Sequence, residues 1–132
     1  MMQADLTTKT LGRRKQAVVQ AKLTPGTGSI TVNGKEFKLY FPHFDWQEIV
    51  KSPFVATGTD KSFDVAARAK GGGIKGQADA LRLAISRGLI KENLEFRPIL
   101  KKLGFLCRDA RVKERKHYGK KKARRSPQWS KR

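Results

Sequence analysis

The sequence predicts an α+β fold: a compact sheet covered by helices on one face, with a long, extended basic C-terminal tail. Segments with apolar residues at every second position come first, and an amphipathic helix at 76–90 follows them. Basic residues then gather at the end, since residues 101–132 contain 14 Lys and Arg and 2 acidic residues, against 16 and 9 in residues 1–100. We therefore expect a flexible lead at 1–10, a globular domain at 11–105 and a tail at 106–132.

The first half of the domain has the alternation of β-strands. Residues 16–23 place four apolar side chains on one face, and a turn at 24–28 leads to a second strand at 29–32. Asn33-Gly34 favours a tight turn into a third extended piece at 35–40, because both residues tolerate positive φ. These segments predict a three-stranded meander, and 61–70 predicts one more strand. The residues expected to face the core are Ala17, Val19, Ala21, Leu23, Ile30, Val32, Phe63, Val65 and Ala67.

Three segments are expected to be helical. Residues 42–50 begin at a proline that fits a first helical turn, and Pro53 is expected to end this helix. The helix at 76–90 repeats apolar residues at intervals of 3 and 4, namely Ala78, Leu81, Ile85 and Leu89. A short helix at 98–103 is expected to end at Gly104, because glycine favours that position.

Charge and composition restrict the partner. A formal net charge of +19 and a pI near 10.7 favour a nucleic acid or an anionic membrane. No stretch approaches 18 apolar residues and the tail has no apolar face, so a membrane is not expected. His43 and His117 lack neighbouring groups for a catalytic relay, and Cys107 is expected to be a small packed residue. We expect no enzyme, metal or cofactor.

The sharpest local motif is the glycine loop, KGGGIKGQ at 70–77. Glycines expose backbone N–H groups, and the following helix directs its positive end at whatever lies in front, which favours an anion. Three readings are open: a structural turn, a nucleotide site of the G-x-G-x-x-G type, and a clamp on a nucleic acid backbone. The chain is short for paired βαβ halves, and Lys70 and Lys75 favour the backbone clamp.

The tail contains few apolar side chains, of which Tyr118 and Trp129 are aromatic. It cannot bury enough surface to offset its ordering entropy, so we expect it to order only against a polyanion. Trp129 between basic residues is suited to stacking on a base or ribose, although docking on a hydrophobic partner is the alternative.

Six segments carry further motifs: GRRK at 12–15, PGTG at 25–28, KGGGIKGQADALR at 70–82, GFLCRDAR at 104–111, ERK at 114–116 and KARRSPQWSKR at 122–132. Together they resemble the family of ribosomal protein nine of the small subunit, in its bacterial or plastid form. The resemblance runs from Leu11 to Arg132, with no family motif in 42–59 and with Trp129 where the family commonly has Phe. The segments 39–41 and 114–119 lean toward the cyanobacterial and plastid branch, so a ribosome in the plastid (chloroplast) stroma or the bacterial cytoplasm is expected.

The resemblance implies a structural constituent of the small ribosomal subunit. Its body would bind ribosomal RNA in the head, beside neighbouring ribosomal proteins, and its tail would reach the anticodon stem-loop of peptidyl-site tRNA. Carried onto this sequence, the tRNA-binding residues are Ser130, Lys131 and Arg132. The expected ribosomal RNA contacts are Arg13, Arg14, Lys15, Lys70, Gly71, Gly72, Gly73, Lys75, Arg108, Arg111, Lys113, Arg115, Lys116, Lys120, Lys121, Lys122, Arg124, Arg125 and Trp129.

Two rival functions stay open at this point. A basic DNA-compacting protein would share the charge but would need a helix with Arg and Lys along its face to enter a groove, and 76–90 offers only Arg82 and Arg87. A nucleotide-dependent enzyme would need a positioned acid or base, for which the sequence offers no candidate.

Overall fold

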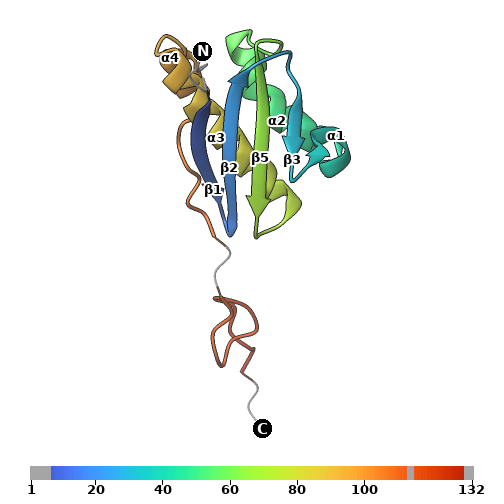
Figure 1. Ribbon diagram of the computed structural model, residues 1–132. Coiled ribbons are helices and arrows are strands. Elements are labelled where there is room, and N and C mark those ends of the chain that lie inside the picture. The colour runs from blue at the N-terminus through green and yellow to red at the C-terminus, as the bar shows by residue number, and fades with distance from the viewer. Residues whose placement is uncertain (1–6, 113–114, 130–132) are drawn as a thin grey trace.

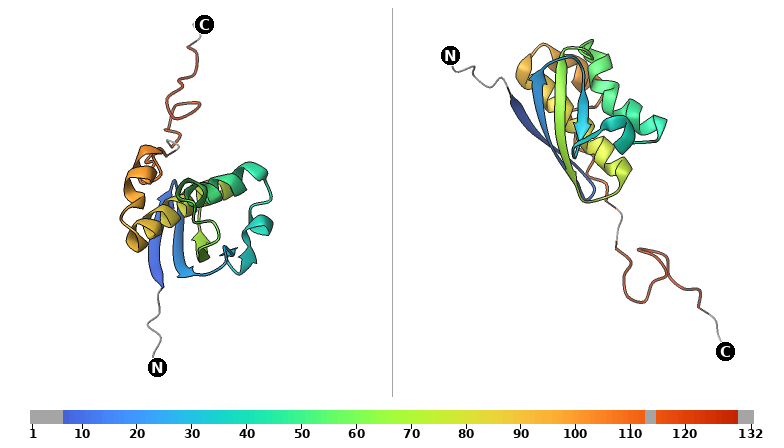
Figure 2. Two further views of the ribbon diagram at one scale, coloured as in Figure 1. Left: turned by 90° about the horizontal axis from the view of Figure 1, so that it is seen from above. Right: turned by 45° about the vertical axis from the view of Figure 1, so that its right-hand side comes forward.

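The computed structural model describes residues 7–112 and 115–129 (Figure 1). Its elements are β1 (Thr8–Arg14), β2 (Ala17–Pro25), β3 (Ile30–Val32), β4 (Lys35–Glu36), α1 (Phe37–Tyr40), α2 (Phe44–Thr57), β5 (Phe63–Lys70), α3 (Ile74–Glu92) and α4 (Phe96–Lys102). The strands form one sheet in the order β1-β2-β5-β3-β4. Helices α2 and α3 cover one of its faces, and the tail leaves the body beyond α4 (Figures 1 and 2). The expected α+β class is confirmed.

The core forms between β2 and α3. The four predicted inward residues of β2, Ala17, Val19, Ala21 and Leu23, are at most 1% exposed, and the apolar stripe of α3, Ala78, Leu81, Ile85 and Leu89, is fully buried. These exposures confirm both predicted faces. A strand of period 2 and a helix of period 3.6 can each present one continuous apolar surface, so the two surfaces pack against each other. The helix α3 lies across β1 and β2 behind the sheet (Figure 1).

The predicted three-stranded meander is wrong, although the tight turn at Asn33-Gly34 is confirmed between the antiparallel strands β3 and β4. β5 lies between β2 and β3, antiparallel to β2 and parallel to β3. The connection after β2 does not form a hairpin, because Asp64 of β5 accepts hydrogen bonds from the backbone N–H groups of Thr27, Gly28 and Ser29 at 2.9–3.0 Å. These hydrogen bonds hold the segment between β2 and β3 across the end of β5, so that β3 pairs with the other edge of β5.

An edge strand, β1, occupies part of the segment expected to be a flexible lead, since it begins at Thr8. The side of β1 that faces α3 carries polar or small residues, which gave the sequence no apolar alternation. The hydroxyl of Thr10 donates to the carbonyl oxygen of Ala84 at 2.8 Å. Gly12 leaves room for the helix backbone, since a Cβ there would lie 1.9 Å from the carbonyl oxygen of Ala80.

The expected extended piece at 35–40 is only half right. β4 covers Lys35–Glu36, and the chain then turns into α1, Phe37–Tyr40. Phe37 and Phe41 are 5% and 0% exposed. Their spacing of four residues places both rings on one side of the helical turn.

The helix expected at 42–50 continues beyond Pro53 to Thr57, so the prediction that Pro53 ends it is wrong. A proline inside a helix leaves the carbonyl four residues earlier without its backbone donor. Here the hydroxyl of Ser52 donates to the carbonyl oxygen of Ile49 at 2.6 Å and takes over that role. The helix ends instead at Gly58, which has φ of +68°.

The last helix, α4, lies within two residues of its expected bounds and is followed by Gly104 with φ of +76°. Phe105 and Leu106 then pack partly against the core. Cys107 is exposed, so the prediction of a packed cysteine is wrong, because the chain has left the core by that point. Within the described ranges, no helix has the length and apolar character needed to cross a membrane.

Candidate nucleic-acid interface

The glycine loop joins β5 to α3 and presses against the β1–β2 turn. Gly71 and Gly72 have φ of +75° and +65°. A Cβ atom on them would lie 2.6 Å from the carbonyl oxygen of Gln16 and 2.9 Å from the backbone nitrogen of Ala17, so this approach requires glycine. Gly73 precedes α3 without a side-chain capping bond, and the first turn of α3 contains no acidic residue. The positive end of the helix dipole is therefore not neutralised from within the turn.

Two basic segments meet at this end of the body. In the sheet register, Val18 lies opposite both Arg13 and Lys70. Arg13, Lys15, Lys70 and Lys75 are all exposed. The sequence identified both segments as candidates, but their proximity depends on the β2–β5 pairing, which the predicted meander did not contain.

The geometry rules against a dinucleotide site at the glycine loop. Such a site needs a helix that leads into a second parallel strand. Here β5 pairs antiparallel with β2, and α3 leads to α4 in the described part of the chain. The buried side chain of Gln77 donates to the carbonyl oxygen of Gly71 at 3.0 Å and accepts from the hydroxyl of Tyr40, so it braces the loop from inside.

Arg14 serves a different role from its exposed neighbours. Its side chain is only 12% exposed, with Nε 3.1 Å from Oδ2 of Asp79 and Nη1 3.0 Å from Oδ2 of Asp109. Arg111 also pairs with Asp109, through Nη2 at 2.8 Å from Oδ2. The hydrogen bonds from Arg111, with the charge of Arg14, hold the pKa of Asp109 well below its ordinary value. This cluster, Arg14, Asp79, Asp109 and Arg111, fastens the start of the tail to the body.

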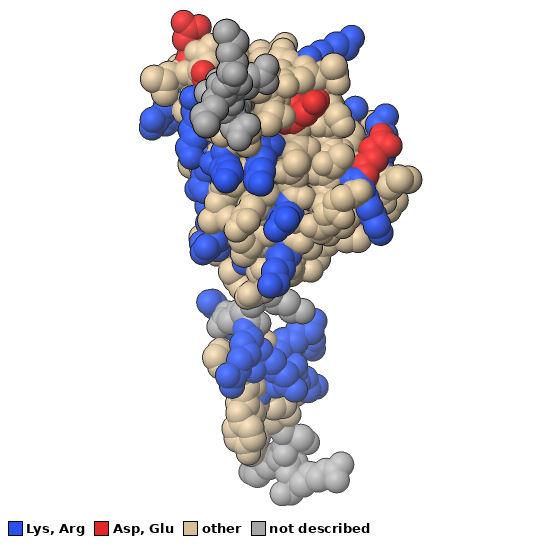
Figure 3. Space-filling view, viewed as in Figure 1, with Lys and Arg blue, Asp and Glu red and all other residues tan. Residues whose placement is uncertain are grey.

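The described tail has neither helix nor strand, and most of its basic side chains point to solvent (Figure 3). It folds back on itself, since the backbone N–H of Lys121 donates to the carbonyl oxygen of Arg125 at 2.8 Å. Trp129 is 80% exposed, as a stacking surface would be. Lys113 and the three residues assigned to tRNA, Ser130, Lys131 and Arg132, lie outside the described residues. The exposed cations of the described tail are Arg108, Arg111, Arg115, Lys116, Lys120, Lys121, Lys122, Arg124 and Arg125.

Sequence reasoning missed three exposed cations on the sheet itself. Lys9, Lys22 and Arg68 lie on the face of the sheet that carries no helix. Figure 3 shows Lys and Arg side chains gathered over this face. Gln20 and Lys22 alternate with the buried residues of β2, so their outward direction could be read from the sequence. Their grouping with Lys9 and Arg68 required the strand order.

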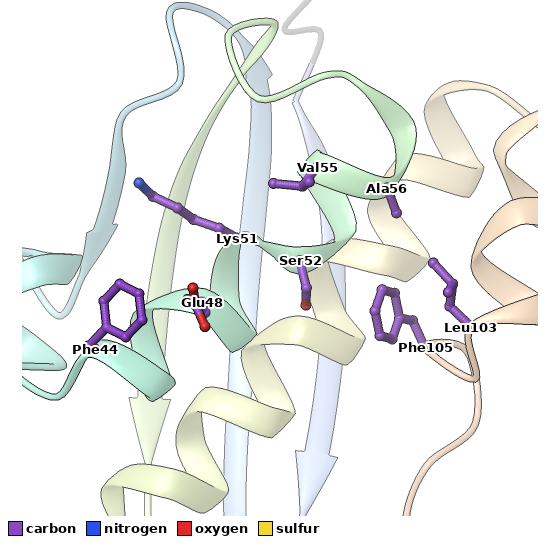
Figure 4. A pocket seen from close by; sticks show the side chains of 8 residues that line it. All are labelled: Phe44, Glu48, Lys51, Ser52, Val55, Ala56, Leu103 and Phe105. Atoms are coloured by element: carbon purple, nitrogen blue, oxygen red, sulfur yellow. The ribbon is translucent and has the colours of Figure 1, made fainter.

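A shallow groove of about 590 Å³ lies between α2 and the segment after α4 (Figure 4). It is mostly apolar, with Glu48, Lys51 and Ser52 as its polar residues.

His43 lies outside this groove and accepts a hydrogen bond from the backbone N–H of Asp45 at 3.3 Å, as the N-terminal cap of α2. In the part of the chain that the structure describes, no group of three His, Cys, Asp or Glu residues could hold a metal ion.

Comparison with known proteins identifies the family. The family described as ribosomal protein S9/S16 matches residues 12–132. Proteins named small ribosomal subunit protein uS9 from Salinispora arenicola and Nocardia farcinica are each 55% identical over 97% of this chain. The matched region covers 83% of the first relative and 77% of the second. The uS9 of Mycobacterium tuberculosis is 53% identical over 94% of this chain and 82% of its own length. These relatives are bacterial and lend no support to the plastid alternative. A match over nearly the whole chain, with relatives above half identity, shows that the chain belongs to the ribosomal protein S9/S16 family.

Proposed function

We propose that this protein is a structural component of the small ribosomal subunit that binds its ribosomal RNA with the body and extends its tail to tRNA in the peptidyl site. The family is one of ribosomal structural proteins and not of enzymes. It implies ribosomal RNA and other ribosomal proteins as partners in a bacterial-type ribosome. The RNA contacts of single residues and the contact with tRNA are the proposed part.

The observation that carries this proposal is that features suited to RNA binding gather at one end of the body. The glycine loop, the β1–β2 turn and the start of the tail lie together there, because Arg14 beside the turn pairs with Asp109 in the tail. Exposed Arg13, Lys15, Lys70 and Lys75 surround the uncapped end of α3. An RNA strand docked at this end would meet cations from the body and then follow the basic tail.

The contacts of α3 speak against DNA compaction as the main function. Arg82 lies over the ring of Phe105, with Cζ 5.2 Å from the centroid. Arg87 donates to the carbonyl oxygen of Leu11 at 2.8 Å. Both arginines are engaged within the protein, and most of α3 is buried against the sheet, so this helix cannot enter a DNA groove.

The tail is suited to reach a site remote from the body. The 16 residues from His117 to Arg132 span at most roughly 53–58 Å when extended. Its cations would neutralise phosphates along the path, and Trp129 would stack on a base or ribose. At the tip, the guanidinium fork of Arg132 would match the phosphate geometry of the anticodon stem-loop better than an ammonium would.

The body contact is tested with full-length variants reconstituted into small subunits and washed with increasing salt. Lys15→Gln, Lys70→Gln and Lys75→Gln together should release the protein at lower salt than the native chain. The matched control removes three exposed charges from α1 and α4, by Lys38→Gln, Lys101→Gln and Lys102→Gln. Equal release of the two variants would refute the role of the glycine-loop end.

The tail contact is tested by deleting Ser130, Lys131 and Arg132. Subunits with the truncated protein should assemble with normal occupancy but hold tRNA in the peptidyl site more weakly. Unchanged tRNA affinity would refute the role of the tip.

Removal of 108–132 should instead reduce occupancy of the subunit, because it removes most of the proposed phosphate contacts.

A further inference from the structure

The face of the sheet opposite α2 and α3 carries no helix or strand in the described chain (Figures 1 and 2). Side chains of alternating residues from β1, β2, β5 and β3 cover it. The register sets them in rows across the strands. One row joins Lys9, Lys22, Ala66 and Thr31, and the next joins Leu11, Gln20 and Arg68.

The charges on this face are arranged unfavourably for the protein alone. Lys9 and Lys22 are directly opposite on neighbouring strands, and like charges in that position are destabilising. Arg68 lies one row away, opposite Gln20. None of these three cations forms an ion pair within the described residues. A sheet face that keeps an unpaired cationic cluster favours an anionic partner.

The acidic residues at the borders do not neutralise the cluster. Asp64 lies opposite Thr24 at one end of the face, and its carboxylate is already occupied by three backbone N–H donors of the preceding turn. Glu36 lies opposite Thr31 at the far edge of the sheet. The cations between these borders therefore keep their positive field.

The shape of this sheet face is also better suited to an RNA backbone than to the apolar surface of a protein partner. Two adjoining hollows of about 470 and 520 Å³ share Lys9, Lys22 and Ala66. Ala66 gives a low floor between the long cationic side chains, and Gln20 and Thr31 add hydrogen-bonding groups. Each of the exposed large apolar residues, such as Phe44 and Val55, lies elsewhere among the described residues. Shape and charge together favour an RNA backbone as the occupant over a protein partner.

We propose that this open sheet face, with Lys9, Lys22 and Arg68 as its phosphate-binding residues, is a second RNA-docking surface. It holds the sugar-phosphate backbone of a structured segment of small-subunit RNA. Gln20 and Thr31 supply hydrogen bonds to phosphate or 2′-hydroxyl oxygens. The identity of the RNA rests on the proposed function. Lys9, Lys22 and Arg68 are distinct from the residues assigned to the glycine-loop end, which this face adjoins through its next row, Arg13, Val18 and Lys70.

The direct test is amine labelling of the native chain, free and in assembled small subunits. Lys9 and Lys22 should react with an acylating reagent in the free protein and be protected in the subunit. Ultraviolet crosslinking of the assembled subunit should then join peptides of β1, β2 or β5 to RNA. Labelling that is unchanged on assembly, or protection accompanied by crosslinks to a protein only, would overturn the proposal.

A variant test separates binding from folding. In the full chain, Lys9→Gln, Lys22→Gln and Arg68→Gln should leave the melting temperature unchanged or higher, because a like-charge pair is removed. The same variant should lower the slope of log affinity against log salt for small-subunit RNA by about 2, since each phosphate contact contributes about 0.7 for a single strand. A slope equal to that of the Lys38, Lys101 and Lys102 control would refute a role for this face.

The two proposals fail in different ways. If the native chain does not enter small subunits, the proposed function fails and takes this inference with it. If the native chain enters and its glycine-loop variant is weakened, while Lys9 and Lys22 remain reactive, only the open sheet face is excluded.

Discussion

Replacement of Gly12 by alanine should severely destabilise the fold. The new Cβ would lie 1.9 Å from the carbonyl oxygen of Ala80, 2.8 Å from the backbone nitrogen of Ala84 and 3.0 Å from the carbonyl carbon of Ala80. All three atoms belong to the backbone of α3, so no side-chain rotation can relieve the contact. An ordinary contact begins at 3.4 Å, so α3 must retreat from β1 by about 1.5 Å.

The cost has two parts. Overpacking of a closed interface typically costs about 1–3 kcal/mol, and a clash with backbone belongs at the upper end. The same retreat breaks the bond from the hydroxyl of Thr10 to the carbonyl of Ala84, which contributes roughly 1 kcal/mol. We expect a loss of about 3–4 kcal/mol in the free energy of unfolding, or a fall in melting temperature of roughly 12–30 °C.

The assay is chemical and thermal unfolding of the full-length protein, followed by circular dichroism. Gly76→Ala, in the first turn of α3, is the matched control. A Cβ there would lie 3.6 Å from the carbonyl oxygen of Arg14 and 3.7 Å from the Cβ of Ala17, which are ordinary contact distances. Alanine is the better helix former, so this control should gain up to about 1 kcal/mol. The reasoning fails if Gly12→Ala loses less than 1 kcal/mol, or if the two variants shift stability in the same direction.

Three further outcomes follow from particular contacts. Asp64→Asn should lower the melting temperature at pH 7 and lower it less in acid. Hydrogen bonds from backbone N–H groups, led by the one from Ser29, lower the pKa of the Asp64 carboxyl in the folded protein. The stabilisation by the carboxylate is therefore present above the unfolded-state pKa and is lost as the pH falls through the folded-state pKa. Melting curves at several pH values check this, and a pH-independent difference would contradict it. Asp109→Asn should speed trypsin cleavage after Arg108 and Arg111, because the tail loses its pairing with Arg14, and mass spectrometry of timed digests would expose an unchanged rate. Ser52→Ala should cost about 1 kcal/mol in denaturant unfolding, by leaving the carbonyl of Ile49 without its donor; a Thr replacement that restores stability would support the cause, and a neutral Ala variant would dismiss it.

The sequence predicted the elements whose core faces are apolar. The stripe of α3 and the inward residues of β2 repeat with the helical and strand periods, so they could be identified without a structure. β1 was missed because Thr10 and Gly12, which face α3, contribute a hydrogen bond and a close backbone approach instead of apolar surface. The extension of α2 past Pro53 was missed because it depends on one serine hydroxyl.

The candidate site was predictable where it is local and unpredictable where it is assembled. The glycine loop could be named from backbone chemistry, and Arg13 and Lys15 from the resemblance to the family. The engagement of Arg14 by Asp79 and Asp109 could not, because those residues are 65 and more positions away and meet only through the packing of α3 and the tail. The cluster on the open sheet face likewise depends on strand order.

The pairing of Arg14 with Asp109 makes the rest of the tail a tether with a fixed origin. From Val112 to Trp129 the chain has 18 residues and a reach of at most roughly 59–65 Å. Once the body is docked, every cation on this tether searches a bounded volume around the docked end, so its encounter with RNA is intramolecular and governed by effective concentration. The body and the tail then differ in binding kinetics as well as in position. The body binds RNA by a bimolecular collision in solution, whereas the tail binds in an intramolecular step within a radius set by its length from the Arg14–Asp109 pair.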